Sequence, residues 1–189
     1  MIAVLTGPVR SGKSTMALSL ALASGQQVVL AVGGRADDPE MARRIARHQE
    51  NRPSSVTVLE VGEDPGWLEA IDPAACLLVD CLGTVLGLSL AALVPDGADI
   101  AGADAEERAR AIADALVDGL LARSGPTIVV TNEVGWGVVP ATPLGRLFRD
   151  TLGYANRRLI DEADIAWLVV AGRSIGLADL PQEVAWPAP

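Results

Sequence analysis

Short apolar runs alternate along the chain with longer helix-forming segments, and this order predicts a parallel sheet with helices on both faces. Gly, Pro, Asn and Asp residues separate the segments and mark the turns. The predicted strands are residues 2–5, 28–32, 55–61, 76–80, 127–131 and 165–170, and the predicted helices are residues 15–23, 39–50, 82–93, 105–123 and a long helix that begins at Pro143 after the N-cap Thr142.

The length of 189 residues suits one α/β domain with a full core. We expect this domain to span residues 1–180, followed by a Pro-rich tail at residues 181–189. Residues 94–104 form a Gly- and Asp-rich loop, which is the best candidate for a mobile segment. No internal repeat and no second domain is evident in the pattern.

Residues 7–14 fit the phosphate-loop pattern G-x-x-x-x-G-K-[ST] at every fixed position, between a predicted strand and a predicted helix. The two glycines let backbone N–H groups turn toward phosphate oxygens, and the helix start adds partial positive charge. A chance match in a Gly-rich turn is the alternative, and the strand–loop–helix context disfavours it. We therefore predict a single-domain P-loop NTPase-like (RecA-like) fold with nucleotide-binding residues Gly7, Pro8, Val9, Arg10, Ser11, Gly12, Lys13 and Ser14. Lys13 is expected to reach the β- and γ-phosphates, and the Ser14 hydroxyl is expected to bind Mg²⁺.

Asp80 ends a buried apolar run and has the form of a Walker B acid, which would complete the Mg²⁺ site. The alternative is that Asp80 is the N-cap of the next helix. Ligands of open α/β sheets bind at the carboxyl ends of the strands. By this rule Thr6, residues 32–34 and residues 131–133 are further candidates for the ligand site. Asn132 and Glu133 begin a loop that suits a substrate, although an ordinary turn with Trp136 against the core fits the same pattern.

The net charge of −9 argues against general affinity for nucleic acid or anionic membranes. No apolar stretch reaches the roughly 20 residues of a membrane span, and the N-terminal apolar run is too short for a signal peptide. Cys76 and Cys81 form no CxxC pair, and core packing is their expected role. These features predict a reduced, cytoplasmic protein.

His48 is the only histidine, and it lies near the end of the one basic segment of an acidic chain. Neighbouring arginines disfavour imidazolium, so His48 is expected to be neutral and nucleophilic at pH 7. The same arginines could hold a nucleotide triphosphate. Composition alone favours a solvated histidine on a charged helix.

Several strings together resemble one known family. They are the end of the phosphate loop (Arg10 to Ser14), residues 38–53 around His48, the string Thr131-Asn132-Glu133-Val134-Gly135-Trp136-Gly137-Val138-Val139-Pro140, and Phe148-Arg149-Asp150 with Gly153 and Asn156. The chain from Ile2 to about Gly172 resembles the bifunctional adenosylcobinamide kinase / adenosylcobinamide-phosphate guanylyltransferase family of cobalamin biosynthesis.

The resemblance implies two reactions that use GTP, with ATP as a possible kinase donor, and Mg²⁺. Adenosylcobinamide is phosphorylated on its aminopropanol hydroxyl, and a GMP–histidine intermediate then passes GMP to adenosylcobinamide phosphate, which gives adenosylcobinamide-GDP. The resemblance gives His48 the role of the histidine nucleophile, and it suggests a homotrimer. It adds the nucleotide-binding positions Val32, Gly33, Gly34, Gln49, Glu50, Asn51, Arg52, Glu60 and Asp80.

Three positions depart from the family pattern. Gly33-Gly34 stand where an alcohol or amide residue is frequent, Arg47 stands where a second histidine can occur, and Asp80 replaces a longer Glu. Two other functions remain open at this point: a P-loop kinase of another small metabolite, and a nucleotide-dependent switch protein.

Overall fold

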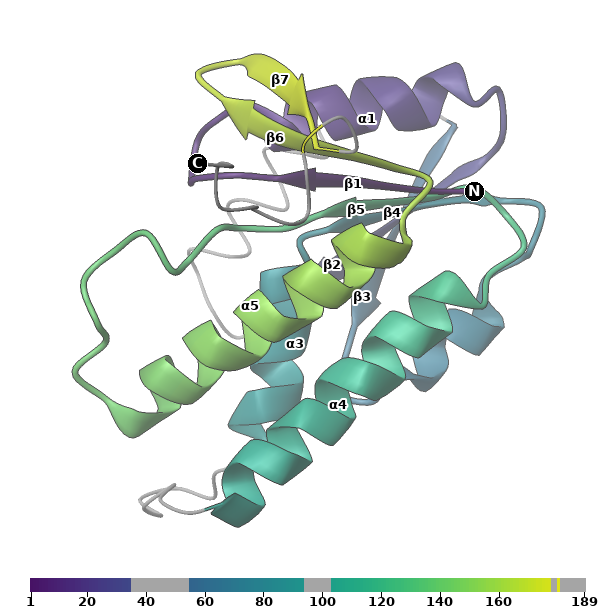
Figure 1. Ribbon diagram of the computed structural model, residues 1–189. Helices are drawn as coiled ribbons and strands as arrows, with labels where there is room; N and C mark the ends of the chain where they lie inside the picture. Colours follow the sequence, from purple (N-terminus) through teal and green to yellow (C-terminus); the bar gives the residue numbers. More distant parts are fainter. Residues whose placement is uncertain (35–54, 94–102, 178–179, 181–189) are drawn as a thin grey trace, which may run out of the picture.

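The computed structural model describes residues 1–34, 55–93, 103–177 and 180, and it shows a central sheet covered by helices on both faces (Figure 1). The described residues form a 7-stranded sheet with the strand order β3-β2-β4-β5-β1-β6-β7. The β6–β7 pair is antiparallel, and every other neighbouring pair is parallel. The strands are β1 Ile2–Thr6, β2 Val28–Gly33, β3 Val56–Val61, β4 Cys76–Asp80, β5 Thr127–Val130, β6 Ile165–Val170 and β7 Arg173–Gly176, and the helices are α1 Lys13–Ala23, the 3₁₀-helix η1 Pro65–Ala70, α3 Leu82–Ala91, α4 Ala103–Leu121 and α5 Pro143–Glu162.

The predicted α/β class with a mostly parallel sheet is confirmed, and β5 separates the strand before the phosphate loop from the strand that ends in Asp80. Every predicted strand is present within a residue or two of its expected bounds. The prediction that Thr142 caps α5 is confirmed, because its Oγ1 accepts a hydrogen bond from the Gly145 N–H at 3.1 Å. The predicted helix at residues 39–50, most of the predicted loop at 94–104 and the tail at 181–189 lie outside the described residues.

Two elements were missed by the sequence analysis, and two helix starts were placed too late. The 3₁₀-helix η1 and the strand β7 have no clear apolar periodicity. Helix α1 begins at Lys13 rather than Thr15, so the last residues of the phosphate-loop pattern form its first turn. Helix α4 begins at Ala103, two residues before the predicted start.

Among the helices in the described ranges, α1 packs on one face of the sheet (Figure 1). Ala17 and Ala21 of this helix are fully buried, and their small side chains let the helix lie close to the strands. The sheet contributes the alternate residues of each strand to this layer, among them Ala3 and Leu5 of β1.

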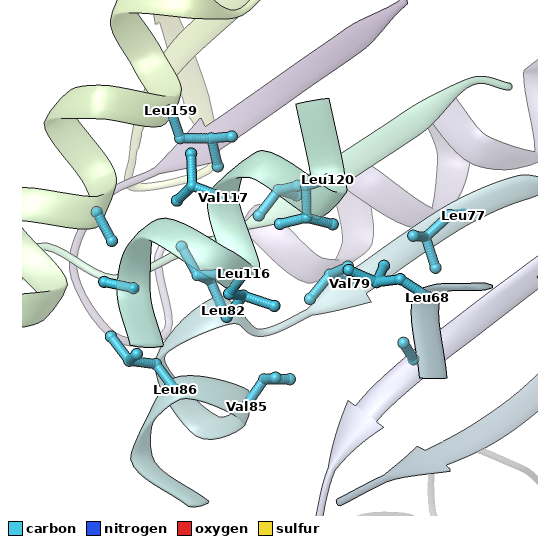
Figure 2. Packing of buried hydrophobic residues seen from close by; sticks show 14 of the residues in the cluster. Leu68, Leu77, Val79, Leu82, Val85, Leu86, Leu116, Val117, Leu120 and Leu159 are labelled. Carbon is cyan, nitrogen blue, oxygen red and sulfur yellow. The ribbon is translucent and has the colours of Figure 1, made fainter. Parts of the chain in front are cut away.

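The other face packs against α3, α4 and α5 (Figure 1). Figure 2 shows leucines and valines of α3 and α4 converging on β4, where Leu77 and Val79 point toward them. This layer and the α1 layer bury the strands on both sides, which is the condition under which parallel sheets are stable. No helix in the described ranges has both the length and the apolar character that a membrane span requires.

Candidate active site

The phosphate loop joins β1 to α1 and requires glycine at two positions. Gly7 has a φ of 142°, and a Cβ on it would lie 2.3 Å from the carbonyl oxygen of Val169 in β6. Gly12 is the N-cap of α1, where its φ of 100° is left-handed. These two glycines let the loop pass close to β6 and then turn directly into the helix, as a phosphate-binding turn must.

The turn between β6 and β7 supports the phosphate loop from the side. Ala171 and Gly172 both have positive φ, 50° and 75°, as in the tight turns that join antiparallel strands. The Gly172 N–H donates a hydrogen bond of 2.8 Å to the Ser11 carbonyl oxygen. This contact is not predictable from the sequence, because the Ala-Gly pair is a weak turn signal and no local pattern connects it to Ser11.

Lys13 is buried within the loop that it serves, with an exposed fraction of 5%. Its Nζ donates hydrogen bonds of 2.8 Å to the carbonyl oxygens of Gly7 and Pro8. Burial lowers the pKa of Lys13 below its ordinary value, while the charges of Cys81, Asp80 and Glu133 act in the opposite direction. A buried ammonium inside a phosphate-loop turn is suited to bind an anionic group such as a phosphate.

Asp80 lies at the end of β4 and contacts the first turn of α1. The Ser14 Oγ donates a hydrogen bond to Asp80 Oδ1 at 3.2 Å, so the two predicted metal ligands are neighbours. The N-cap interpretation of Asp80 is wrong, because the N-cap of α3 is Cys81. Among the described residues no three His, Cys, Asp or Glu side chains form a metal cluster. A hydroxyl and one carboxylate nevertheless fit Mg²⁺, which takes few protein ligands and completes its shell with phosphates and water.

Glu133 is held against the phosphate loop from three elements. Its N–H donates to the Gly7 carbonyl oxygen at 3.2 Å, and its Oε1 accepts from the Thr6 Oγ1 at 2.5 Å. Asn156 of α5 is 3% exposed, and its Nδ2 donates to the Asn132 carbonyl oxygen at 3.0 Å and to Glu133 Oε1 at 3.5 Å. The Asn156 Oδ1 accepts from Thr131 Oγ1 at 2.5 Å. Sequence matching singled out Asn156 without giving it a role.

The loop after Glu133 is apolar and exposed. Trp136 has an exposed fraction of 64%, so the alternative in which Trp136 lies against the core is wrong. Val138 and Val139 are exposed as well. Three large apolar side chains exposed within a few residues of Glu133 make this loop a candidate binding surface.

The predicted positions on β2 and β3 lie at the same carboxyl-end edge of the sheet, but several strands away from the phosphate loop. Val32 pairs with Glu60 across β2 and β3. Gly33 lies against the start of α3, where a Cβ would be 2.7 Å from the Val85 nitrogen, so close packing explains this glycine. The strand order puts β2 three strands from β1, or roughly 14 Å at the usual spacing. The structure therefore brings residues 7–14, Asp80 and Glu133 together. Val32, Gly33, Gly34 and Glu60 lie three or more strands from β1, on the other side of Asp80, because β2 pairs directly with β4.

The remaining predicted positions have mixed outcomes. His48 and the positions Gln49, Glu50, Asn51 and Arg52 lie outside the described residues. Cys76 is fully buried, as expected for a core residue. Cys81 is half-buried and packs against the core cluster on the α1 face of the sheet, and its Sγ also accepts a hydrogen bond from Asn132 Nδ2 at 3.7 Å.

Comparison with known proteins identifies the family of the chain. A family model described as cobinamide kinase / cobinamide phosphate guanyltransferase matches residues 3–177. The bifunctional adenosylcobalamin biosynthesis protein CobU of Salmonella typhimurium is 36% identical over 177 residues, which are 91% of this chain and 97% of that protein. The corresponding protein CobP of Pseudomonas aeruginosa is 35% identical over 183 residues, 94% of this chain and 98% of its own. The RadB recombinase structure aligns with 88% of this chain and 73% of its own at 16% identity and a TM-score of 0.40.

Proposed function

Because the chain belongs to the cobinamide kinase / cobinamide phosphate guanyltransferase family, we propose that it carries out both reactions of that family. It phosphorylates the aminopropanol hydroxyl of adenosylcobinamide, and it then transfers GMP from GTP to the resulting phosphate to give adenosylcobinamide-GDP. The observation that carries the proposal is the convergence of Lys13, the Ser14–Asp80 pair and Glu133 at one end of the sheet.

In the kinase step the loop holds the triphosphate and Lys13 stabilises the charge that develops on the transferred group. Ser14 and Asp80 would hold Mg²⁺, which when bound neutralises charge on the β- and γ-phosphate oxygens. The donor is ATP or GTP, since the phosphate loop contacts only the part that the two nucleotides share. The exposed loop with Trp136 is the proposed contact for the corrinoid.

In the guanylyl step a His48 ring nitrogen forms a bond to the α-phosphorus of GTP, and the bond to the bridging oxygen breaks to release pyrophosphate. Imidazole suits this task because it is nucleophilic when neutral and leaves readily from a phosphoramidate. Residues 35–54, which include His48, follow directly on Gly34 in the chain. We assign Val32, Gly33, Gly34, Gln49, Glu50, Asn51, Arg52 and Glu60 to the nucleoside side of GTP. The homotrimer and the cytoplasmic location stay predictions.

The test is incubation with Mg²⁺ and GTP labelled at the α-phosphate, followed by intact-mass measurement and peptide mapping. We expect one GMP on the wild-type protein, bound at His48, lost in acid and stable in base. His48→Asn should retain kinase activity, which needs no covalent intermediate, and should lose the adduct and the transferase.

Other outcomes separate the competing functions. Kinase activity without an adduct in wild type would favour a kinase of another metabolite. Nucleotide binding without turnover of a corrinoid would favour a switch protein. Label that appears equally in the His48→Asn protein contradicts the histidine mechanism.

A further inference from the structure

We propose that Glu133 is the general base of the kinase step and that Asn156 is the residue that positions it. This inference rests on the proposed function and goes beyond it, because it gives the acid after β5 a chemical role that is distinct from substrate contact.

Asp80 and Glu133 are the carboxylates of the described residues that lie near enough to Lys13 to act on its ammonium. Asp80 accepts a hydrogen bond from Ser14, the other proposed Mg²⁺ ligand, so we assign Asp80 to the metal site. Glu133 follows β5, which pairs with β1, the strand that leads into the phosphate loop. Its backbone N–H donates a hydrogen bond to the Gly7 carbonyl oxygen. The two acids therefore approach the loop from different strands, β4 and β5, and can serve different functions.

The hydrogen bonds to the Glu133 carboxylate all go to one oxygen. Oε1 accepts from Thr6 Oγ1 at 2.5 Å and from Asn156 Nδ2 at 3.5 Å. In the part of the chain that the structure describes, no residue hydrogen-bonds Oε2, and Glu133 is only half-buried. One oxygen thus fixes the orientation of the group, and the other is open to a ligand. A general base needs this arrangement, because its proton-accepting atom must be held in place and still be accessible.

Asn156 is buried and uses both ends of its amide in this site. Its Oδ1 accepts from Thr131, and its Nδ2 donates to the Asn132 carbonyl oxygen and to Glu133. Helix α5 packs on the sheet through residues such as Leu152 and Leu159, so Asn156 connects a rigid element to the loop that carries the acid. A buried amide with these partners fixes the direction of the loop after β5.

The proton of the acceptor hydroxyl moves to Oε2 of Glu133 while the hydroxyl oxygen forms a bond to the γ-phosphorus. The bond between the γ-phosphorus and the β–γ bridging oxygen breaks, and the nucleoside diphosphate leaves with the electron pair. Glu133 then returns its proton to solvent. The guanylyl step uses a histidine nucleophile on GTP and does not need this acid.

The experiment compares both half-reactions in Glu133→Gln, with Glu162→Gln as the matched control. Glu162 is on the same helix as Asn156, is 52% exposed and pairs with Arg158. We expect Glu133→Gln to lower kcat of the kinase step by about 10²-fold or more, to change KM for the nucleotide little, and to form the GMP adduct at the wild-type rate. Formate should restore kinase activity to Glu133→Ala, and chloride at equal ionic strength should not.

The positioning role of Asn156 has its own readout. Asn156→Asp keeps an acceptor for Thr131 and removes the donor to Glu133, so it should lower kcat of the kinase step with little change in KM. Added to Glu133→Gln it should have no further effect, since there is no base left to position.

Three results would overturn the proposal. They are wild-type kinase kcat in Glu133→Gln, equal loss of kinase and adduct formation in that variant, and additive effects of the two substitutions. Failure of the proposed function looks different, because wild type itself would then lack kinase activity on the corrinoid or the GMP adduct.

Discussion

Gly7→Ala is the substitution whose cost the structure defines most directly. The new methyl group would lie 2.3 Å from the Val169 carbonyl oxygen, where no real Cβ is found, and the φ of 142° is one that alanine rarely adopts. The contact is with backbone in β6, which cannot turn away as a side chain could. We add about 1–3 kcal/mol for the strained backbone to about 1–3 kcal/mol for overpacking, about 2–6 kcal/mol in all.

A matched control for this change exists in the same chain. Gly153 is an exposed residue inside α5, and a Cβ there meets nothing within 4 Å. Gly153→Ala should therefore stabilise the protein by about 0.5–1 kcal/mol, because alanine loses less backbone freedom in a helix. The same chemical change is expected to act in opposite directions at the two sites.

The assay is thermal unfolding followed by circular dichroism, with nucleotide binding measured by a fluorescent GTP analogue. For a chain of this size 1 kcal/mol corresponds to roughly 2–4 °C in Tm. We therefore expect Gly7→Ala to lower Tm by roughly 4–24 °C and Gly153→Ala to raise it by roughly 1–4 °C. Gly7→Ala should also lose nucleotide binding, because relief of the contact moves the loop. A Gly7→Ala protein with wild-type Tm and wild-type binding would refute the steric argument.

Two further substitutions test charged groups of the site, Lys13 in the phosphate loop and Asp80 at the end of β4. Lys13→Met should lower both half-reactions by about 10²-fold or more, because the loop serves both. Burial lowers the pKa of Lys13, so its ammonium costs folding free energy at pH values below its folded pKa; at pH 7 the Tm of Lys13→Met should equal or exceed that of wild type. Asp80→Asn should raise the Mg²⁺ concentration needed for half-maximal rate in a steady-state titration, with circular dichroism unchanged, whereas overlapping titrations would exclude Asp80 as a metal ligand.

The sequence was sufficient wherever function depends on a short local pattern. The phosphate loop is recognisable because Gly7, Gly12 and Lys13 occur at fixed spacing between an apolar run and a helix former. Asp80 is recognisable because it ends the apolar strand β4. Glu133 is recognisable because it follows β5, the next strand in the chain, whose carboxyl end lies at the same edge of the sheet. In each case the chain itself sets the geometry, through strand direction and loop length.

The rest depends on contacts between distant residues, which no local pattern encodes. Strand β7 is a strand because it pairs with β6, not because Arg173–Gly176 alternates. Asn156 contacts Asn132 across 24 residues, and which atoms it joins depends on how α5 packs. The exposure of Trp136 likewise follows from the path of its loop, since the same sequence could have turned the indole inward.

The strand order suggests how one phosphate loop could serve two different reactions. The γ-phosphate of a bound nucleotide is expected near Lys13, where Glu133 arrives from β5. In our proposal the nucleoside end of the nucleotide points toward β2 and β3. The α-phosphate is then closer to β2 than the γ-phosphate is, and β2 is the strand that precedes His48 in the chain. In our proposal each reacting phosphorus has its own attacking group, the acceptor hydroxyl for the γ-phosphorus and the His48 imidazole for the α-phosphorus. On this view selectivity between the reactions depends on which nucleophile is present and not on a second nucleotide site.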